Sequence, residues 1–188
     1  MEEKLFLKNY LKELSELVSS NDEIIDQLIL CKDQIIKANK NGNKTLIFGN
    51  GGSAAIASHF SVDLTKNAKV RCVNFNESDL ITCFSNDYGF ENWIAQAIDF
   101  YGNPGDVLIA ISSSGQSKNM LNGCDAASQK KFSSIITFSG FKIDNPLKSK
   151  GNTNLWVRSK AYNYVENMHQ IWLLAIVDLI IGNKEYSA

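Results

Sequence analysis

Apolar residues recur at helical spacing in two blocks within the first forty residues of the chain. The first block predicts a helix over residues 3–19, and the second predicts a helix over residues 23–40. Between them, Ser20-Asn21-Asp22 breaks the first helix and supplies residue types that cap helices such as the second. Neither block carries side chains in a pattern that indicates chemistry. We therefore expect the two helices to cover the core or to join subunits.

From residue 45 onward, short apolar runs alternate with longer segments of helical spacing. The runs predict strands at 45–48, 70–75, 106–111, 132–138 and 153–158. The intervening segments predict helices at 53–67, 78–86, 91–101, 117–129 and 162–181. Strands that alternate with helices are typical of the α/β class with a mainly parallel sheet, which is the fold class we expect.

The first predicted strand ends in a glycine-rich turn, Gly49-Asn50-Gly51-Gly52-Ser53, and a helical pattern starts at once. Glycines allow a tight turn and let a ligand approach the backbone closely. The first amides of the following helix lack partners within the helix and lie at the positive end of its dipole, which favours a phosphate. Further along this helix, His59 and Asp63 are four residues apart, so both side chains share one helical face.

A second polar loop follows the third predicted strand, with the sequence Ser112-Ser113-Ser114-Gly115-Gln116-Ser117. Hydroxyls and backbone amides together can encircle a phosphate without any lysine. Ser117 would also cap a helix in the absence of a ligand. Ligands of parallel sheets lie at the carboxyl ends of strands, where both loops are expected to fall. Two such loops favour a phosphorylated ligand over a pair of capping turns.

The first loop also matches the dinucleotide-binding pattern G-x-G-x-x-A through Gly49, Gly51 and Ala54. That interpretation requires an acidic residue at the end of the second strand, where Glu77 is the only candidate and lies slightly late. It also leaves the serine loop without a role. We therefore expect no nucleotide cofactor.

Length and composition limit these interpretations. With 188 residues, of which 44% are hydrophobic, one domain is expected over 1–188, with 1–41 as N-terminal helices. The net charge of −1 argues against nucleic acid or an anionic membrane as a partner. The cysteines form no C-x-x-C pair and are expected to be buried thiols. The N-terminus has no signal-peptide pattern, and the apolar run 171–181 is too short to span a bilayer, so a cytoplasmic location is predicted.

An ordered set of motifs resembles the sugar isomerase (SIS) domain. It comprises the glycine loop with the following His59-Phe60, then Asn86-Asp87-Tyr88-Gly89-Phe90, then Gly105-Asp106-Val107-Leu108 and the serine loop. Within this family the motifs are similar to the phosphoheptose isomerase branch, which interconverts sedoheptulose 7-phosphate and D-glycero-D-manno-heptose 7-phosphate. The resemblance covers nearly the whole chain.

The resemblance implies a flavodoxin-like three-layer α/β/α sandwich with a five-stranded sheet, and a homotetramer with sites between subunits. It also implies which residues bind the phosphorylated sugar. They are Asn50, Gly51, Gly52, Ser53, Asn86, Asp87, Ser112, Ser113, Ser114 and Ser117.

Roles in an aldose–ketose isomerisation through an enediol follow from the same resemblance. Such a reaction needs a base to move a proton between neighbouring carbons, and an acid or a metal to steady the oxyanion. The family uses a glutamate four residues after the first-helix histidine, together with a last-helix histidine. Here His59 matches the first histidine, Asp63 stands in place of the glutamate, and Glu166 stands where a glutamine is expected. The predicted catalytic residues are Asp63, His59 and Glu166.

The last-helix histidine is replaced by Leu174, which can neither transfer a proton nor bind a metal. His169 is a poor substitute because it lies about 140° around the helix from Leu174. Glu166 and His169 are spaced i, i+3, so a structural ion pair between them is an alternative. His59, Asp63 and Glu166 still offer one nitrogen and two carboxylates. We therefore predict that these three residues bind zinc or another divalent ion.

Two functions remain open from the sequence. The first is a sugar-phosphate isomerase acting on a heptose or related ketose phosphate, with Asp63 as the base. The second is a catalytically silent sugar-phosphate-binding protein that acts as a regulator or a protein-binding tetramer. Leu174 favours the second function. The carboxylates of Asp63 and Glu166 favour the first, because negative charges beside a phosphate site repel the ligand and need a reason to be there.

Overall fold

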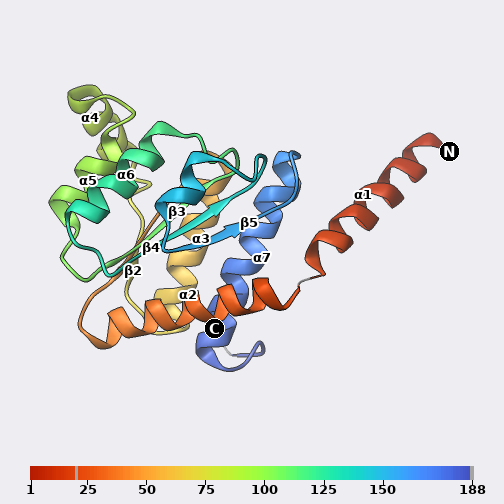
Figure 1. Ribbon diagram of the computed structural model, residues 1–188, viewed down its shortest axis with the longest axis horizontal. Helices are drawn as coiled ribbons and strands as arrows, with labels where there is room; N and C mark the ends of the chain where they lie inside the picture. The colour runs from red at the N-terminus through yellow and green to blue at the C-terminus, as the bar shows by residue number, and fades with distance from the viewer. Residues whose placement is uncertain (20, 187–188) are drawn as a thin grey trace.

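A five-stranded sheet in which every pairing is parallel forms the centre of the molecule (Figure 1). The computed structural model describes residues 1–19 and 21–186. The sheet has the order β2-β1-β3-β4-β5, so the order reverses between β1 and β3, which is the switch point where such sheets bind ligands. The strands are β1 (Thr45–Phe48), β2 (Cys72–Val73), β3 (Val107–Ser112), β4 (Ser134–Ser139) and β5 (Thr153–Trp156).

Helices cover both faces of the sheet, which confirms the predicted three-layer α/β/α sandwich. They are α1 (Glu2–Val18), α2 (Asp22–Lys40), α3 (Gly52–Lys66), α4 (Ser78–Tyr88), α5 (Trp93–Tyr101), α6 (Lys118–Gln129) and α7 (Tyr162–Ile181), with a 3-10 helix η1 (Pro146–Lys150). Side chains alternate across the strands, so Ile47 and Ile109 pack against α2, α3 and α7. Leu46 and Leu108 pack on the other face against α5 and α6.

Two parts of the sheet and its connections differ from the sequence prediction. The second strand is shorter than 70–75, because the chain turns away from β1 after Val73. Asn74 then donates to the Ser61 hydroxyl at 2.6 Å, and Asn76 donates to the Ala54 carbonyl at 2.8 Å, both on α3. The helix η1 was not predicted. It begins with Pro146 in its first turn and is capped by the side chain of Asn145.

The first helix, α1, projects from the rest of the molecule (Figure 1). It has no buried residue, and Tyr10 makes its clearest contact with the body, where its carbonyl accepts a 3.0 Å hydrogen bond from the Tyr164 hydroxyl. Several apolar side chains of α1 are more than half exposed, namely Leu5, Phe6, Leu7 and Leu11. An apolar helix face that the chain's own core does not cover is typical of a subunit contact.

The last helix, α7, forms a wall of the core. By length and composition it could cross a bilayer, although the shorter run 171–181 suggested otherwise. Of its most apolar 18 residues, 44% are buried in the molecule. A core helix passes the same test of length and hydropathy. Three cysteines are buried as predicted, whereas Cys83 on α4 is exposed, so the prediction is wrong at that position.

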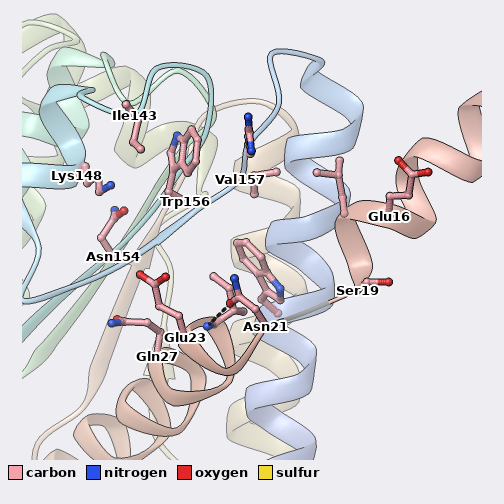
Figure 2. Close-up of a pocket in the computed structure, with 14 residues that line it drawn as sticks. Glu16, Ser19, Asn21, Glu23, Gln27, Ile143, Lys148, Asn154, Trp156 and Val157 are labelled. Carbon is pink, nitrogen blue, oxygen red and sulfur yellow. Dashed lines mark hydrogen bonds between the residues drawn. The ribbon is translucent and has the colours of Figure 1, made fainter.

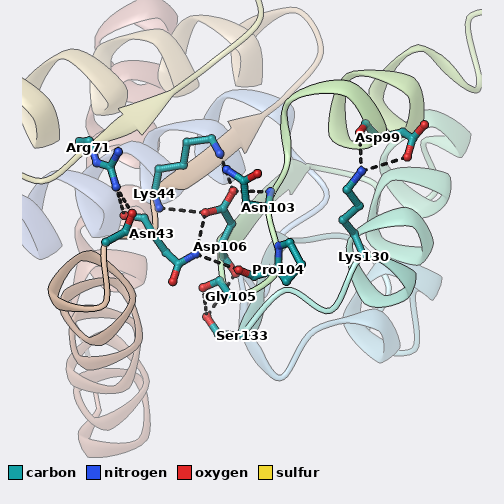
Figure 3. A network of polar contacts seen from close by, with 11 residues as sticks. Asn43, Lys44, Arg71, Asp99, Asn103, Pro104, Gly105, Asp106, Lys130 and Ser133 are labelled. Atoms are coloured by element: carbon teal, nitrogen blue, oxygen red, sulfur yellow. Dashed lines mark hydrogen bonds and ion pairs between the residues drawn. The ribbon is translucent and has the colours of Figure 1, made fainter.

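Asp106 is a fully buried carboxylate at the start of β3 (Figure 3). It accepts hydrogen bonds from the Lys44 ammonium at 2.6 Å, the Lys44 backbone amide at 3.0 Å and the Asn103 amide at 2.8 Å. Burial alone would raise the pKa of Asp106, but the bonds from Lys44 and Asn103 outweigh it and lower that pKa below its usual value. Since Lys44 precedes β1, this network joins the starts of two neighbouring strands.

His169 is a fully buried titratable residue of α7. Its ring packs edge-on against Phe138, with centroids 5.6 Å apart, and its Nε2 lies 3.1 Å from the Ser139 carbonyl oxygen on β4. Nε2 therefore carries the proton, and Nδ1 has no partner among the described residues. Burial lowers the pKa of His169 to about 4, opposed by the bond to Ser139. The predicted alternative of an ion pair between Glu166 and His169 is wrong, because His169 is neutral and bonds to β4.

We expect Asp106→Ala to lower the free energy of unfolding by about 3–5 kcal/mol, because it leaves the Lys44 ammonium without its buried partner. Asp99→Ala is the matched control. That carboxylate pairs with Lys130 in Figure 3, but its side chain is 68% exposed, so its loss is expected to cost about 1 kcal/mol or less. Urea denaturation of both variants measures the difference, and equal costs would contradict the anchoring role of Asp106.

We expect His169 to destabilise the fold in mild acid. Its folded pKa of about 4 lies below the ordinary histidine pKa of 6.5, so the unfolded chain binds more protons than the folded one between these values. Stability should therefore fall as pH decreases through this window, by about 2–3 kcal/mol between pH 7 and pH 4.5. His169→Phe should remove this part of the loss. Urea denaturation of both proteins at the two pH values tests it, and parallel pH dependences would contradict the assignment.

Candidate functional site

The glycine loop and the serine loop lie side by side at the carboxyl edge of the sheet. They follow β1 and β3, which are neighbours with Phe48 in register with Ala110. Asn50 of the first loop and Asn119 at the start of α6 exchange two amide hydrogen bonds, of 3.0 and 2.9 Å. This pair fixes the two loops against one another. The sequence prediction that both loops meet at one edge is therefore confirmed by the strand order.

The two loops enclose a small polar cavity of about 120 Å³. The serine loop contributes hydroxyls to its lining, and α7 contributes Tyr162 and Glu166. The cavity is lined by Asn50, Ser53, Ile111, Ser112, Ser113, Ser114, Ser117, Tyr162 and Glu166. A cavity of this kind, beside the first turn of α6, suits an anion that accepts several hydrogen bonds.

The serine hydroxyls do not make hydrogen bonds that cap the N-terminus of α6. Ser117 occupies the N-cap position, yet its side chain makes no capping hydrogen bond and instead lies 3.0 Å from the Ser112 hydroxyl. Ser113 is 6% exposed, and its hydroxyl has no partner among the described residues. A buried hydroxyl without a partner is uncommon and is satisfied when a ligand accepts from it. The serine loop therefore does more than cap a helix, because it leaves a buried hydroxyl without a protein partner among the described residues.

The glycine loop brings its backbone against α7. Gly51 has a φ of +54°, a conformation that other residues rarely adopt. A Cβ atom at Gly52 would collide with the carboxylate of Glu166. Glu166 therefore rests directly on the first turn of α3, next to the serine cavity.

A second cavity, of about 340 Å³, continues on the other side of Glu166. It lies between α3 and α7 and is lined by Gly52, Ala55, Ile56, His59, Glu166, Asn167 and Gln170. Glu166 is the residue common to both cavities. A ligand with an anionic end among the serines could extend past Glu166 towards His59.

His59 and Asp63 lie on one face of α3, as their spacing predicted, and their side chains are in contact. His59 Nε2 lies 3.2 Å from Asp63 Oδ2, with side chains 47% and 23% exposed. The other carboxylate oxygen of Asp63 accepts from the Asn67 amide at 3.2 Å. The other ring nitrogen of His59, Nδ1, lies 3.2 Å from the side-chain nitrogen of Gln170 on α7.

Gln170 and Asn67 are missing from the residues predicted by sequence. A signal for Gln170 was present, since it lies four residues after Glu166 and four before Leu174 and so shares their helical face. Asn67 lies four residues after Asp63 in the same way. Spacing alone does not identify either residue as part of a site, because uncharged amides are common on surface helices.

The predicted metal ligands do not fit a divalent ion as they are placed. No group of three or more His, Cys, Asp or Glu side chains in the described residues is arranged to bind a metal. Both ring nitrogens of His59 and both carboxylate oxygens of Asp63 already have protein partners, while Glu166 lies against Gly52. The metal site stays a prediction, and no chemical step is derived through it.

Asn86 and Asp87 lie apart from the two loops. Both are exposed on the last turn of α4, where the Asn86 amide donates to Asp87 at 2.9 Å. Neither residue lines the cavity at the serines or the cavity at His59. Within one chain, therefore, the structure brings together the glycine loop, the serine loop, His59 and Glu166, but not this pair.

A further cavity, of about 410 Å³, lies beyond the edge strand β5 (Figure 2). The end of α1, the start of α2, β5 and Trp172 of α7 form its walls, and no predicted site residue lines it. Three of its polar atoms are buried without a partner in the described residues, on Gln27, Asn154 and Trp156. Because it is at the edge of the sheet and away from the switch point, it is separate from the two cavities described above.

Comparisons with known proteins agree with this arrangement. The profile of the SIS domain matches residues 6–139. Phosphoheptose isomerase of Campylobacter concisus is 31% identical over 183 residues, which cover 94% of this chain and 96% of that protein. Phosphoheptose isomerase of Buchnera aphidicola is 36% identical over 184 residues, covering 95% and 89%.

Two further similarities concern part of the chain and the fold. Phosphoheptose isomerase 2 of Campylobacter jejuni is 38% identical over 130 residues, covering 65% of this chain and 64% of that protein. The structure of phosphoheptose isomerase from Neisseria gonorrhoeae superimposes with a TM-score of 0.87 at 24% identity, covering 94% of this chain and 98% of that one. The profile match and the full-length relatives show that the chain belongs to the SIS domain family, in its phosphoheptose isomerase branch.

Proposed function

We propose that the chain is a sugar-phosphate isomerase that interconverts sedoheptulose 7-phosphate and D-glycero-D-manno-heptose 7-phosphate through an enediol. The observation that carries the proposal is the pair of cavities that share Glu166. One cavity offers hydroxyls for a phosphate, and the other is lined by His59, whose Nε2 contacts Asp63. The names of the full-length relatives give the same reaction class.

The phosphate end of the sugar would lie in the serine cavity. Ser113 has a buried hydroxyl free to donate among the described residues, and Ser112 and Ser117 form a hydroxyl pair beside it. Asn50, Gly51, Gly52, Ser53 and Ser114 complete the binding set on the two loops. No lysine or arginine lines this cavity, so recognition depends on neutral donors and the first turns of α3 and α6.

The reacting carbons would lie near the second cavity, with Asp63 as base. Asp63 removes a proton from the carbon next to the carbonyl, the carbonyl oxygen gains a proton, and an enediol forms. Return of a proton to the former carbonyl carbon, with loss of the proton from the hydroxyl on the first carbon, forms the new carbonyl and completes the isomerisation. His59, which contacts Asp63, is placed to donate to the developing oxyanion, and Glu166 to orient a sugar hydroxyl between the cavities.

A complete site is proposed to need neighbouring copies in a cytoplasmic homotetramer. The exposed apolar residues of α1 support a contact between chains. The separation of Asn86 and Asp87 from the two cavities supports a site to which a second copy brings these residues. The exposed face of α1 and the position of Asn86 and Asp87 are both observed in a single chain.

A catalytically silent sugar-phosphate-binding protein is the alternative, and Leu174 favours it. This leucine lies one turn beyond Gln170 on the face of α7 that Glu166 shares, and it supplies no acid or base. The two functions differ in one observable: an isomerase exchanges the proton beside the carbonyl, whereas a silent binder does not.

Incubation with sedoheptulose 7-phosphate in deuterated water, followed by NMR, tests the proposed function. An isomerase should introduce deuterium at the carbon beside the carbonyl and form the aldose. Exchange without aldose would show that the base works and the acid is missing. Binding without any exchange would contradict the isomerase and favour the silent protein.

We expect Asp63→Asn to lower turnover by about 100-fold or more, because the amide cannot accept the proton. Binding of the sugar phosphate should persist, since Asp63 does not line the serine cavity. Asp125→Asn, at an exposed carboxylate of α6 that pairs with Lys150, is the matched control and should keep full turnover. Unchanged turnover in Asp63→Asn would rule out its role as base.

We expect Gly52→Ala to lower kcat/KM by about 10- to 100-fold, because the added methyl group displaces the Glu166 carboxylate from between the cavities. The free energy of unfolding should change by about 1 kcal/mol or less, since Glu166 is a flexible side chain that can move. Glu166→Gln combined with Gly52→Ala should show little further loss beyond Glu166→Gln alone. Fully additive losses would contradict this explanation.

A further inference from the structure

Four side chains form a continuous polar chain from the end of α3 to α7. Asn67 donates to Asp63 Oδ1 at 3.2 Å, Asp63 Oδ2 contacts His59 Nε2 at 3.2 Å, and His59 Nδ1 contacts Gln170 Nε2 at 3.2 Å. The first three belong to one helix, at i, i+4 spacing. Gln170 is the member that comes from a different element.

The donors and acceptors along this chain select one form of the imidazole. A carboxylate only accepts, so the contact with Asp63 requires a proton on His59 Nε2. In the neutral ring Nδ1 is then an acceptor, and the amide nitrogen of Gln170 is the donor that it needs. The protonated Nε2 thus faces an acceptor, Asp63, and the unprotonated Nδ1 faces a donor, Gln170.

We propose that Gln170 is a positioning residue that fixes the tautomer and orientation of His59, so that His59 Nε2–H points to Asp63 and the substrate oxygen near it. The proposal rests on the proposed isomerase function and deepens it. Gln170 then supplies from α7 the support for the acid–base pair that Leu174, one turn later, does not provide.

The position of Gln170 agrees with this role. It is half-buried and lines the same cavity of about 340 Å³ as His59 and Glu166. His59 itself is exposed on α3, with its side chain 47% accessible, so packing does not hold the ring, and Asp63 is its contact on its own helix. Gln170, from the opposite wall of the cavity, supplies the second contact, at the other ring nitrogen. For histidines that bind metals, removal of such a hydrogen-bonded partner typically changes activity by about 10- to 100-fold, and we expect an effect of the same order here.

The chain contains two histidines, which makes the tautomer directly measurable. Protein labelled with ¹⁵N-histidine gives resonances from His59 and His169 alone, and buried His169 serves as an internal reference for Nε2–H. At pH 8, above the usual range of histidine pKa values, wild-type His59 should show a protonated Nε2 and an unprotonated Nδ1. The spectrum needs no substrate and no turnover.

Two substitutions of Gln170 change the partner of Nδ1 in opposite ways. Gln170→Met keeps the length of the side chain but removes the donor, so His59 should become a mixture of tautomers. Gln170→Glu replaces the donor by an acceptor, so Nδ1 should gain a proton. Gln129→Leu, at an exposed glutamine at the end of α6, is the control and should leave both histidines unchanged.

Turnover provides the second readout. Gln170→Met should lower kcat about 10- to 100-fold while KM changes by about threefold or less, because the serine cavity that holds the phosphate is intact. A general loosening of the contact between α3 and α7 would instead raise KM and shift the His169 resonances.

A Gln170→Met protein whose His59 keeps a pure Nε2–H tautomer would overturn the proposal, as would a wild-type His59 protonated at Nδ1. If the wild-type protein shows no turnover, the isomerase function fails. The resonances of His59 would still decide whether Gln170 fixes the ring, so the two failures are distinguishable.

Discussion

The pairing of β1 with β3 is the constraint on which the rest of the site depends. Asp106, at the start of β3, binds Lys44, immediately before β1, through both its backbone amide and its ammonium group. Register set at this end fixes which residues meet at the other end, where Phe48 lies beside Ala110. The glycine and serine loops begin from those positions. A buried carboxylate at the amino ends of these strands thus helps to position, at their carboxyl ends, the cavity proposed to bind phosphate.

Most of the fold could be predicted from the sequence because its signals are local. Apolar runs flanked by glycines and asparagines indicate buried strands, and the helical spacing between them is regular. The prediction is wrong where contacts between distant parts of the chain determine where an element ends. The strand predicted at 70–75 is shortened because Asn74 and Asn76 bind α3, and no periodicity reports such bonds. The two loops were predictable because they follow strands, and parallel strands end at one edge of the sheet.

The acid–base half of the site was harder to predict. The spacing of His59 and Asp63 placed them on one face, and the structure has them in contact. The partner of His59 was not predictable, because Gln170 is a neutral amide more than a hundred residues away. The metal set of His59, Asp63 and Glu166 was chosen by residue type. In the structure these three side chains are not arranged around a common point. Glu166 packs on Gly52, whereas His59 contacts Asp63 and Gln170.

The replacement of a histidine by Leu174 has a physical consequence for the division of work between α3 and α7. With no titratable group at that position, α7 offers the second cavity a carboxylate at Glu166 and an amide at Gln170. In the proposed mechanism, proton removal falls to Asp63 on α3, while Glu166 and Gln170 on α7 orient the substrate and the imidazole. An amide is suited to orienting an imidazole because it carries no charge that would compete with Asp63 for the ring proton. In the proposed mechanism the base therefore comes from α3, while the proposed phosphate site at the switch point does not include position 174.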